Sequence, residues 1–189
     1  MKADLSPEVI VLPSSAQESL PVRLPETERI PEQAEPESAI RSVFIVCSTG
    51  GHLTQLHSLR KWWEQKERVW VTFDKEDARS LLEREKVVWA YHPTTRNVLN
   101  AARNLRLAFR VLRRQRPDLV LSDGAGVAFP FFVAAKALGI KTAYIEVCDR
   151  LDSATVTGKL CYPLSDHFFL QHEDQKQFYP RGVLIGSLL

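Results

Sequence analysis

The 189-residue sequence has no run that approaches the roughly 20 consecutive apolar residues of a membrane-spanning helix. Its first residues do not combine a basic start with an apolar centre, as a signal peptide does. The three cysteines, Cys47, Cys148 and Cys161, form no C-x-x-C pair, and two of them lie in or beside apolar segments. We therefore expect buried free thiols in a reducing cytoplasm. No histidine has metal-ligand spacing to a cysteine or carboxylate, so we expect no metal site and no cofactor.

Residues 1–40 contain no glycine and no aromatic residue, but six of the eleven prolines. Such a segment cannot bury enough apolar area to offset the entropy of ordering it. We therefore predict a disordered tail over residues 1–40 and one folded domain over residues 41–189. Residues 1–41 carry four basic and eight acidic residues, which leaves 21 basic and 15 acidic residues in the remainder. That moderately basic domain suits a phosphate-bearing partner or an anionic membrane surface.

Beyond the tail, short apolar runs alternate with segments of helical periodicity. The pattern predicts strands at residues 43–48, 68–73, 87–91, 119–122, 141–147, 167–171 and 183–185. It predicts helices at residues 53–63, 75–85, 96–115, 127–138, 155–164 and 173–178. The alternation indicates an α/β fold, a Rossmann-like parallel sheet with helices on both faces. Ligands of such sheets bind beyond the carboxyl ends of the strands, near a topological switch point.

A short polar loop follows the first strand and contains Ser48, Thr49, Gly50, Gly51 and His52. Its glycines permit a tight turn, and the helix that follows would present unpaired N–H groups to an anion. His52 lies at the start of that helix, where a neutral imidazole could accept a proton from a hydroxyl. The loop matches neither G-x-G-x-x-G nor a Walker motif, so a simple strand–helix turn remains the alternative.

Two further segments carry polar side chains at the ends of strands. Asp123, Gly124 and Gly126 follow the fourth strand, where the aspartate could cap the next helix or hold a sugar hydroxyl. Glu146 interrupts the apolar fifth strand near its carboxyl end. It could bind hydroxyls, act as a base, or pair with Arg150. Arg150 is itself a candidate residue for binding the phosphate of an acceptor.

The long helix at residues 96–115 is amphipathic. Its predicted apolar stripe consists of Val98, Ala102, Leu105, Phe109 and Leu112, and a basic stripe consists of Arg103, Arg106, Arg110 and Arg113. The basic stripe could be a solvated face of a helix that covers the sheet. It could instead lie against anionic lipid headgroups. Nucleic acid is not an expected partner, because the sequence contains no nucleic-acid-binding motif.

The motifs S-T-G-G-H-L at 48–53, D-G-A-G-V-A-F-P at 123–130 and I-E-V-C-D-R at 145–150 resemble a known family. So do G-K-L-C-Y-P-L-S-D-H-F-F-L-Q at 158–171 and Y-P-R-G-V-L-I-G-S-L-L at 179–189. They are similar to the membrane-anchoring acceptor subunit of two-component sugar transferases. That family includes the eukaryotic subunit that helps to add the second N-acetylglucosamine to dolichol-linked sugar, and the bacterial PssD-type exopolysaccharide proteins. The loops more distantly resemble those of MurG, a single-chain GT-B transferase.

The resemblance implies the N-terminal, acceptor-side half of a GT-B glycosyltransferase that acts on a polyprenyl-diphosphate-linked saccharide. A separate small protein would supply the half that binds the UDP-sugar, and no residues remain after the last strand for a second nucleotide-binding domain. By the resemblance, Gly50, Gly51 and His52 would face the lipid diphosphate, and Glu146 would match a polar active-site position. Our own hypothesis is that His52 or Glu146 accepts the proton of the attacking hydroxyl. Eukaryotic members carry a membrane span, whereas this sequence has the proline-rich tail.

We therefore expect a peripheral protein on the cytoplasmic face of the membrane, with Trp62 and Trp63 as further candidate contacts. Two other functions remain open. The chain could be a non-catalytic scaffold that recruits a catalytic partner to the membrane, or a self-sufficient nucleotide-binding enzyme.

Overall fold

The computed structural model describes residues 40–148 and 151–188. The predicted disordered tail therefore lies outside the described residues apart from Ile40, and so does Arg150. Within the described part of the chain, no helix is long and apolar enough to cross a membrane.

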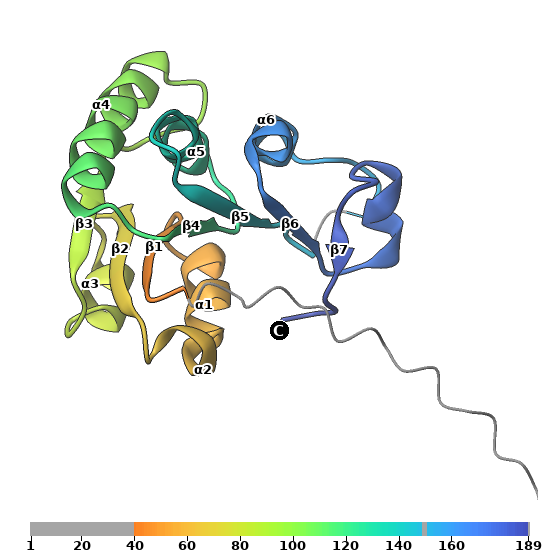
Figure 1. Ribbon diagram of the computed structural model, residues 1–189, viewed down its shortest axis with the longest axis horizontal. Helices are drawn as coiled ribbons and strands as arrows, with labels where there is room; N and C mark the ends of the chain where they lie inside the picture. Colours follow the sequence, from red (N-terminus) through yellow and green to blue (C-terminus); the bar gives the residue numbers. More distant parts are fainter. Residues whose placement is uncertain (1–39, 149–150, 189) are drawn as a thin grey trace, which may run out of the picture. The chain divides into compact units, whose positions relative to one another are not determined.

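The core of the fold is a seven-stranded parallel sheet with the order β3-β2-β1-β4-β5-β6-β7, as Figure 1 shows. The strands are β1 (Ser42–Val46), β2 (Glu67–Phe73), β3 (Val87–Ala90), β4 (Leu119–Ser122), β5 (Lys141–Ile145), β6 (His167–Leu170) and β7 (Val183–Leu184). The strand order reverses between β1 and β4, which pair in register from Val43 opposite Leu119 to Val46 opposite Ser122. The loops that leave these two strands therefore meet at the switch point of the sheet.

Helices cover both faces of the sheet, and each face has its own hydrophobic core (Figure 1). One face carries α4 (Val98–Gln115), α5 (Ala128–Ala137) and α6 (Val156–Cys161). The other carries α1 (Gly51–Ser58), α2 (Arg60–Trp63) and α3 (Glu76–Leu81). Two 3₁₀ turns, η1 (Tyr162–Leu164) and η2 (Glu173–Gln177), flank β6. The predicted Rossmann-like α/β fold is confirmed.

Three of the predicted helices are not single α-helices in the structure. The predicted helix 53–63 is two helices that meet at Leu59, and α1 already begins at Gly51. The predicted helix 155–164 changes to a 3₁₀ turn at Tyr162, next to Pro163, because proline cannot continue the α-helical hydrogen bonding. The last predicted helix, 173–178, is a 3₁₀ turn.

The predicted apolar stripe of α4 is wrong along most of the helix, because only Leu112 of its five residues is buried and Leu105 is half-buried. Val98 is 84% exposed and Phe109 37% exposed, whereas Asn100 and Asn104 are buried. These asparagines bind main-chain groups of the preceding loop: Asn100 donates to the carbonyl of Pro93 at 2.9 Å, and Asn104 pairs with both main-chain polar groups of Tyr91. The start of α4 therefore packs on polar backbone, and its apolar residues remain at the surface.

Candidate functional site

The site predicted from the sequence is formed at the carboxyl edge of the sheet, where β1 and β4 are neighbours. The first glycine-rich loop leaves β1 and leads into α1. The second loop leaves β4 and leads into α5. Parallel strands end at the same edge, so the two loops lie side by side although they are far apart in the sequence.

The first loop is open around its glycines. Gly50 has a φ of 76°, a left-handed conformation that disfavours side chains, and a Cβ added to Gly50 or Gly51 would meet no other part of the chain within 4 Å. The N–H of Gly50 donates to Oδ2 of Asp77, on α3, at 2.8 Å. A carboxylate therefore already occupies part of the anion-binding position at the start of α1. Ser48 and Thr49 are half-buried beside it.

The second loop has two consecutive residues with positive φ, Gly124 at 125° and Ala125 at 59°. A Cβ on Gly124 would lie 2.9 Å from the hydroxyl of Tyr144 and 3.2 Å from Cε1 of His52. Gly126 has equally little room, because a Cβ there would lie 2.9 Å from Thr94. Left-handed backbone at a non-glycine residue is strained and is concentrated at functional sites. The loop is therefore shaped to bring Asp123 and the His52 ring together.

His52 and Asp123 form the central contact of the site. Nδ1 of His52 lies 3.2 Å from Oδ2 of Asp123, and the His52 side chain is 29% exposed while that of Asp123 is fully buried. The helix α5 begins at Ala128 with Val127 as its N-cap and has no side-chain cap, so Asp123 does not cap it. Asp123 instead contacts the partly exposed imidazole of His52, which separates the buried carboxylate from solvent. An imidazole held at Nδ1 by a carboxylate is oriented for proton transfer at Nε2.

Burial raises the pKa of Asp123 from 3.8 to about 6, and the neighbouring His52 limits that rise by its hydrogen bond and its charge. The pKa of Asp123 is therefore set by two opposing effects, burial and the neighbouring imidazole. Perturbed carboxylates of this kind cluster at functional sites.

Glu146 lies just beyond β5 and is 1% exposed. Its Oε1 accepts a hydrogen bond from the hydroxyl of Thr155 at 2.9 Å. The structure therefore does not bring its carboxylate to the surface beside His52. Its sequence-predicted neighbour Arg150 lies outside the described residues.

Two features of the site are not predicted from the sequence. Asp77 lies on a charged helix that reads as solvated, and nothing in its pattern indicates contact with Gly50. The loop at residues 91–97 packs against Gly126 through Thr94, and its rigid attachment depends on the buried Asn100 and Asn104. The sequence signal for this packing was the two asparagines, Asn100 and Asn104, at positions of the helix that turn out to be buried.

The cysteines and histidines form no additional centre. Cys47 and Cys161 are buried, as predicted, and burial raises the pKa of both thiols, whereas Cys148 is exposed, contrary to the prediction. All three are free thiols. Among the residues that the structure describes, no group of three His, Cys, Asp or Glu side chains is placed to hold a metal ion.

A family model described as "Oligosaccharide biosynthesis protein Alg14 like" matches residues 82–188, which is more than half of the chain. The chain belongs to this family. The matched segment begins in the C-cap of α3 and includes the second loop and Glu146, while His52 lies before it.

Curated relatives from the same family match over most of the domain. The human "UDP-N-acetylglucosamine transferase subunit ALG14" is 26% identical over 181 residues, which cover 78% of this chain and 83% of the human protein. The mouse protein of the same name is 27% identical, with 84% of this chain and 88% of its own length covered. The resemblance inferred from the motifs is confirmed.

Solved structures support the fold. MurG of Acinetobacter baumannii superposes with a TM-score of 0.64 at 17% identity, over 78% of this chain and 45% of MurG. UDP-N-acetylglucosamine 2-epimerase of Rickettsia bellii gives 0.63 at 16% identity, over 79% and 45%. The chain thus spans less than half the length of each. The distant likeness to MurG predicted from the loops is confirmed at the level of the fold.

Proposed function

We propose that this chain is the acceptor-binding subunit of a heteromeric glycosyltransferase that moves a sugar from a UDP-sugar to a polyprenyl-diphosphate-linked saccharide. The contact between His52 and Asp123 is the observation that carries the proposal. It joins a residue from each of the two motif loops, and the carboxylate orients the imidazole to accept a proton. The names of the relatives support UDP-N-acetylglucosamine as the donor and a partner subunit.

In the proposed reaction, a hydroxyl oxygen of the acceptor sugar attacks the anomeric carbon of the UDP-sugar. The new C–O bond forms as the bond to the UDP oxygen breaks, and UDP leaves as an anion. The hydroxyl proton passes to Nε2 of His52, while Asp123 holds Nδ1–H and stabilises the imidazolium by its charge. The donor is bound mainly by the partner subunit.

The decisive test uses the chain coexpressed with a candidate partner, a small protein that resembles the UDP-sugar-binding half of a GT-B enzyme. Radiolabelled transfer from UDP-N-acetylglucosamine to a polyprenyl-diphosphate saccharide is measured for wild type, His52→Ala and a control, His172→Gln, at an exposed histidine that caps η2. General-base catalysis contributes about 10²–10⁴-fold, so His52→Ala should lose at least ~100-fold in kcat. Full activity of His52→Ala in an intact complex would reject the assigned role.

The start of α1 is the proposed site for the acceptor diphosphate. The amides of Gly51 and His52 begin the helix, and the open space at both glycines leaves room for a ligand. Asp77 repels an anion there, so we propose that the diphosphate displaces its side chain from Gly50. Ser48, Thr49, Gly124 and Gly126 line the same edge of the sheet and complete the proposed acceptor site.

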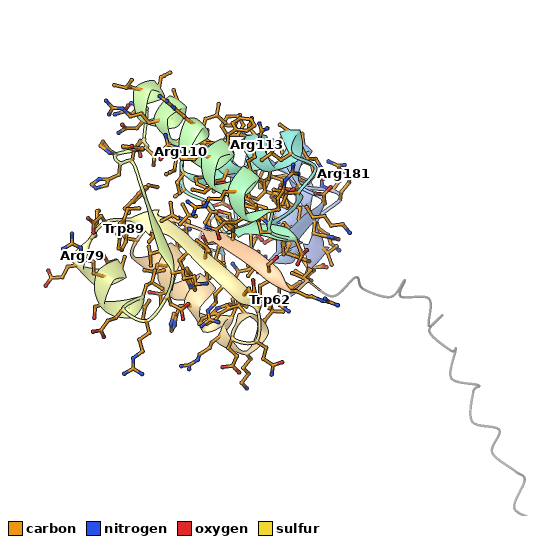
Figure 2. All side chains as sticks on the ribbon, turned by 60° about the vertical axis from the view of Figure 1, so that its left-hand side comes forward. Trp62, Arg79, Trp89, Arg110, Arg113 and Arg181 are labelled. Carbon is orange, nitrogen blue, oxygen red and sulfur yellow. The ribbon has the colours of Figure 1, made fainter. Side chains whose placement is uncertain are left out.

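The exposed face of α4 is the proposed membrane contact. Arg103, Arg106, Arg110 and Arg113 are all exposed, and Arg110 and Arg113 project from the helix in Figure 2. The neighbouring Val98 and Leu99 are 84% and 62% exposed at the end of α4 nearest the carboxyl edge. Cationic and apolar groups together suit the interface of an anionic bilayer. Trp62 lies on the opposite face of the sheet, and Trp63 is buried, so neither shares this surface.

Liposome flotation tests this contact with phosphatidylserine-rich vesicles. Each cation near an anionic leaflet is worth about 1 kcal/mol, so replacing Arg103, Arg106, Arg110 and Arg113 by glutamine should weaken binding by up to ~10³-fold. The matched control replaces four exposed cations around α2 and α3, namely Lys61, Lys75, Arg84 and Lys86. Equal loss in both variants, or binding that 0.5 M salt leaves unchanged, would contradict an α4-specific electrostatic contact.

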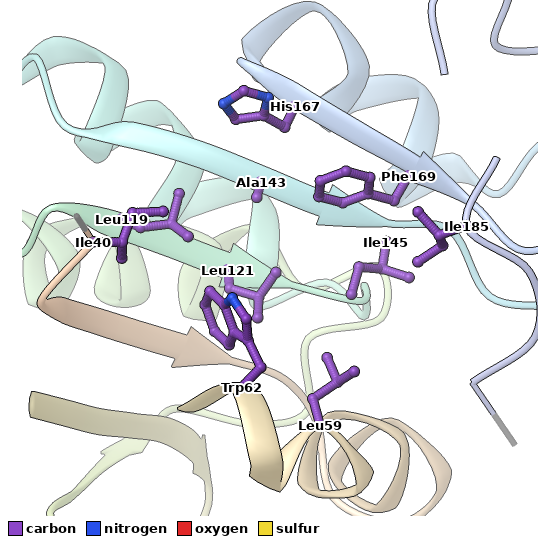
Figure 3. A pocket seen from close by; sticks show the side chains of 10 residues that line it. All are labelled: Ile40, Leu59, Trp62, Leu119, Leu121, Ala143, Ile145, His167, Phe169 and Ile185. Atoms are coloured by element: carbon purple, nitrogen blue, oxygen red, sulfur yellow. The ribbon is translucent and has the colours of Figure 1, made fainter. Parts of the chain in front are cut away.

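An apolar groove of about 310 Å³ is the proposed docking surface for the partner. Figure 3 shows side chains of β4, β5 and β6 facing Trp62 and Leu59 across it. In the adjoining edge strand β7, Val183 and Leu184 are 57% and 39% exposed, and Ile185, just after the strand, is 43% exposed. A parallel sheet is normally covered on both faces, and the relatives are named as subunits. We propose that an apolar segment of the partner covers these strands.

The groove is tested by copurification with the same candidate partner. Ile185→Glu places a charge in the groove and should abolish copurification, because an unpaired buried charge costs several kcal/mol. Val156→Glu, at a 76% exposed position on α6, is the matched control. Retention of the partner by Ile185→Glu would place the interface elsewhere.

A non-catalytic scaffold is the second candidate, and the Asp77–Gly50 contact favours it because the anion position is partly occupied. On that alternative, His52→Ala leaves turnover intact, whereas the four-arginine variant removes the complex from vesicles.

A further inference from the structure

The side chain of Glu146 is enclosed by groups of α6 and its surroundings. Thr155 is the N-cap of α6: its hydroxyl oxygen accepts from the N–H of Gly158 at 2.9 Å, and the same hydroxyl donates to Oε1 of Glu146. One hydroxyl thus connects the carboxylate to the first turn of the helix. Loss of either contact would release the helix start from β5.

Gly158 marks how closely the helix approaches this carboxylate. A Cβ at that position would collide with Oε2 of Glu146 and with the hydroxyl of Tyr179. The nearby carboxylate also raises the pKa of Tyr179, although burial is the larger cause. Glycine is unfavourable in a helix by about 1 kcal/mol, so its presence here indicates that packing requires it.

The main chain of Glu146 is held as firmly as its side chain. Its N–H donates to the carbonyl of Phe169 and its carbonyl accepts from Nε2 of Gln171, both at 2.9 Å. The next carbonyl, that of Val147, accepts from Nε2 of the buried Gln175 at 2.6 Å. The end of β5 is therefore braced from β6 and η2 while its carboxylate binds α6.

We propose that Glu146 is a positioning residue that fixes the start of α6 against the end of β5, and that it is not the proton acceptor. The inference rests on the proposed function, and it decides between His52 and Glu146, the two candidate bases that the sequence offers. A base must come within about 3 Å of the hydroxyl that it deprotonates. Glu146 is 1% exposed and engaged by Thr155, whereas His52 is partly exposed at the loop that faces the acceptor.

The activity test compares Glu146→Ala with Thr155→Val, because threonine cannot act as a base. If Glu146 only positions α6, both variants lose a similar factor, about 5–30-fold for a buried hydrogen bond. Both keep the ascending limb of the kcat–pH profile, which His52→Ala removes. Thr155→Ser restores the hydroxyl and the rate, and Thr157→Val, in the same helical turn, matches wild type. A loss above ~100-fold confined to Glu146→Ala, with loss of the pH limb, would overturn the proposal.

A second measurement needs neither substrate nor partner. Amide exchange of Gly158 in the isolated chain reports the N-cap directly, because that N–H donates to Thr155. Glu146→Ala and Thr155→Val should each accelerate it by about 10-fold, and Thr157→Val should not. If Glu146→Ala leaves the amide exchange of Gly158 unchanged, the positioning role of Glu146 is contradicted, even if the wild-type protein has transfer activity. If exchange is accelerated in Glu146→Ala but the wild-type complex shows no transfer activity, the positioning role of Glu146 is supported and the proposed function is rejected.

Discussion

Replacing Asp123 by asparagine should stabilise the protein at neutral pH while it damages the proposed catalysis. The pKa of Asp123 is raised from 3.8 to about 6, chiefly by burial. Each pKa unit corresponds to about 1.36 kcal/mol, so ionising this carboxyl in the folded state costs roughly 3 kcal/mol of stability. The folded state holds the proton more tightly than the unfolded state. The stability contributed by Asp123 is therefore full below pH 3.8 and is lost as the pH rises through about 6.

Asp123→Asn removes this titration but keeps the size of the side chain. The difference in unfolding free energy between variant and wild type should increase by up to about 3 kcal/mol from pH 4 to pH 7.5. Loss of the contact with His52 offsets about 1 kcal/mol of that gain. Urea denaturation across this pH range measures the difference. Transfer activity should fall by roughly 10²–10⁴-fold, because the imidazole loses the charge that supports its protonation.

Asp118→Asn is the matched control, with the opposite sign. Asp118 accepts from the main-chain N–H of Ser42 and from its hydroxyl, and these hydrogen bonds lower its pKa. Its stabilisation is therefore present above pH 3.8 and is lost as the pH falls through its folded pKa. A pH-independent difference for Asp123→Asn, or its net destabilisation at pH 7.5, would refute the inference that burial governs this carboxylate.

Three further substitutions test the packing and the anion site. Gly158→Ala should lower the unfolding free energy by about 2 kcal/mol or more, because the added Cβ would collide with Glu146 and Tyr179. Gly51→Ala is the control: the space around this position is open, so the unfolding free energy should change by under ~1 kcal/mol. Urea denaturation measures both variants. Asn104→Leu should lower the unfolding free energy by about 2–4 kcal/mol in the same assay, because it leaves the main-chain N–H and carbonyl of Tyr91 without their hydrogen-bond partner. A loss below ~0.5 kcal/mol would contradict a stabilising role for these two hydrogen bonds. Asp77→Ala should raise the affinity for inorganic pyrophosphate by about 2–5-fold in calorimetry, and no change would place the anion elsewhere.

The fold could be predicted because its strands are buried on both faces and alternate with helices. Segments such as Val43–Val46 read as continuous apolar runs, which identifies a parallel sheet without knowledge of its strand order. The buried face of α4 could not be predicted in the same way. Periodicity assigns Val98 to the inside, whereas the observed face depends on which backbone groups of the preceding loop need the amides of Asn100 and Asn104.

The candidate site was predictable in its parts but not in its contacts. His52 and Asp123 were each identified from their loops, yet their pairing depends on β1 lying beside β4, which no local pattern reveals. The burial of Glu146 follows from the approach of α6, where the glycine at 158 was the available signal. The hydrogen bond between Asp77 and the N–H of Gly50 depends on where α3 lies in the fold. The residues around Asp77 in the sequence do not indicate it.

The groove beneath β4, β5 and β6 also affects how the purified chain behaves towards fluorescent dyes. Dyes such as 8-anilinonaphthalenesulfonate bind exposed apolar surface, and such binding is commonly taken as a sign of a molten globule. A fully native chain with this groove unoccupied should bind the dye while its near-ultraviolet circular dichroism and cooperative unfolding remain intact. For this protein, dye fluorescence should therefore report the coverage of one sheet face and not the loss of tertiary structure.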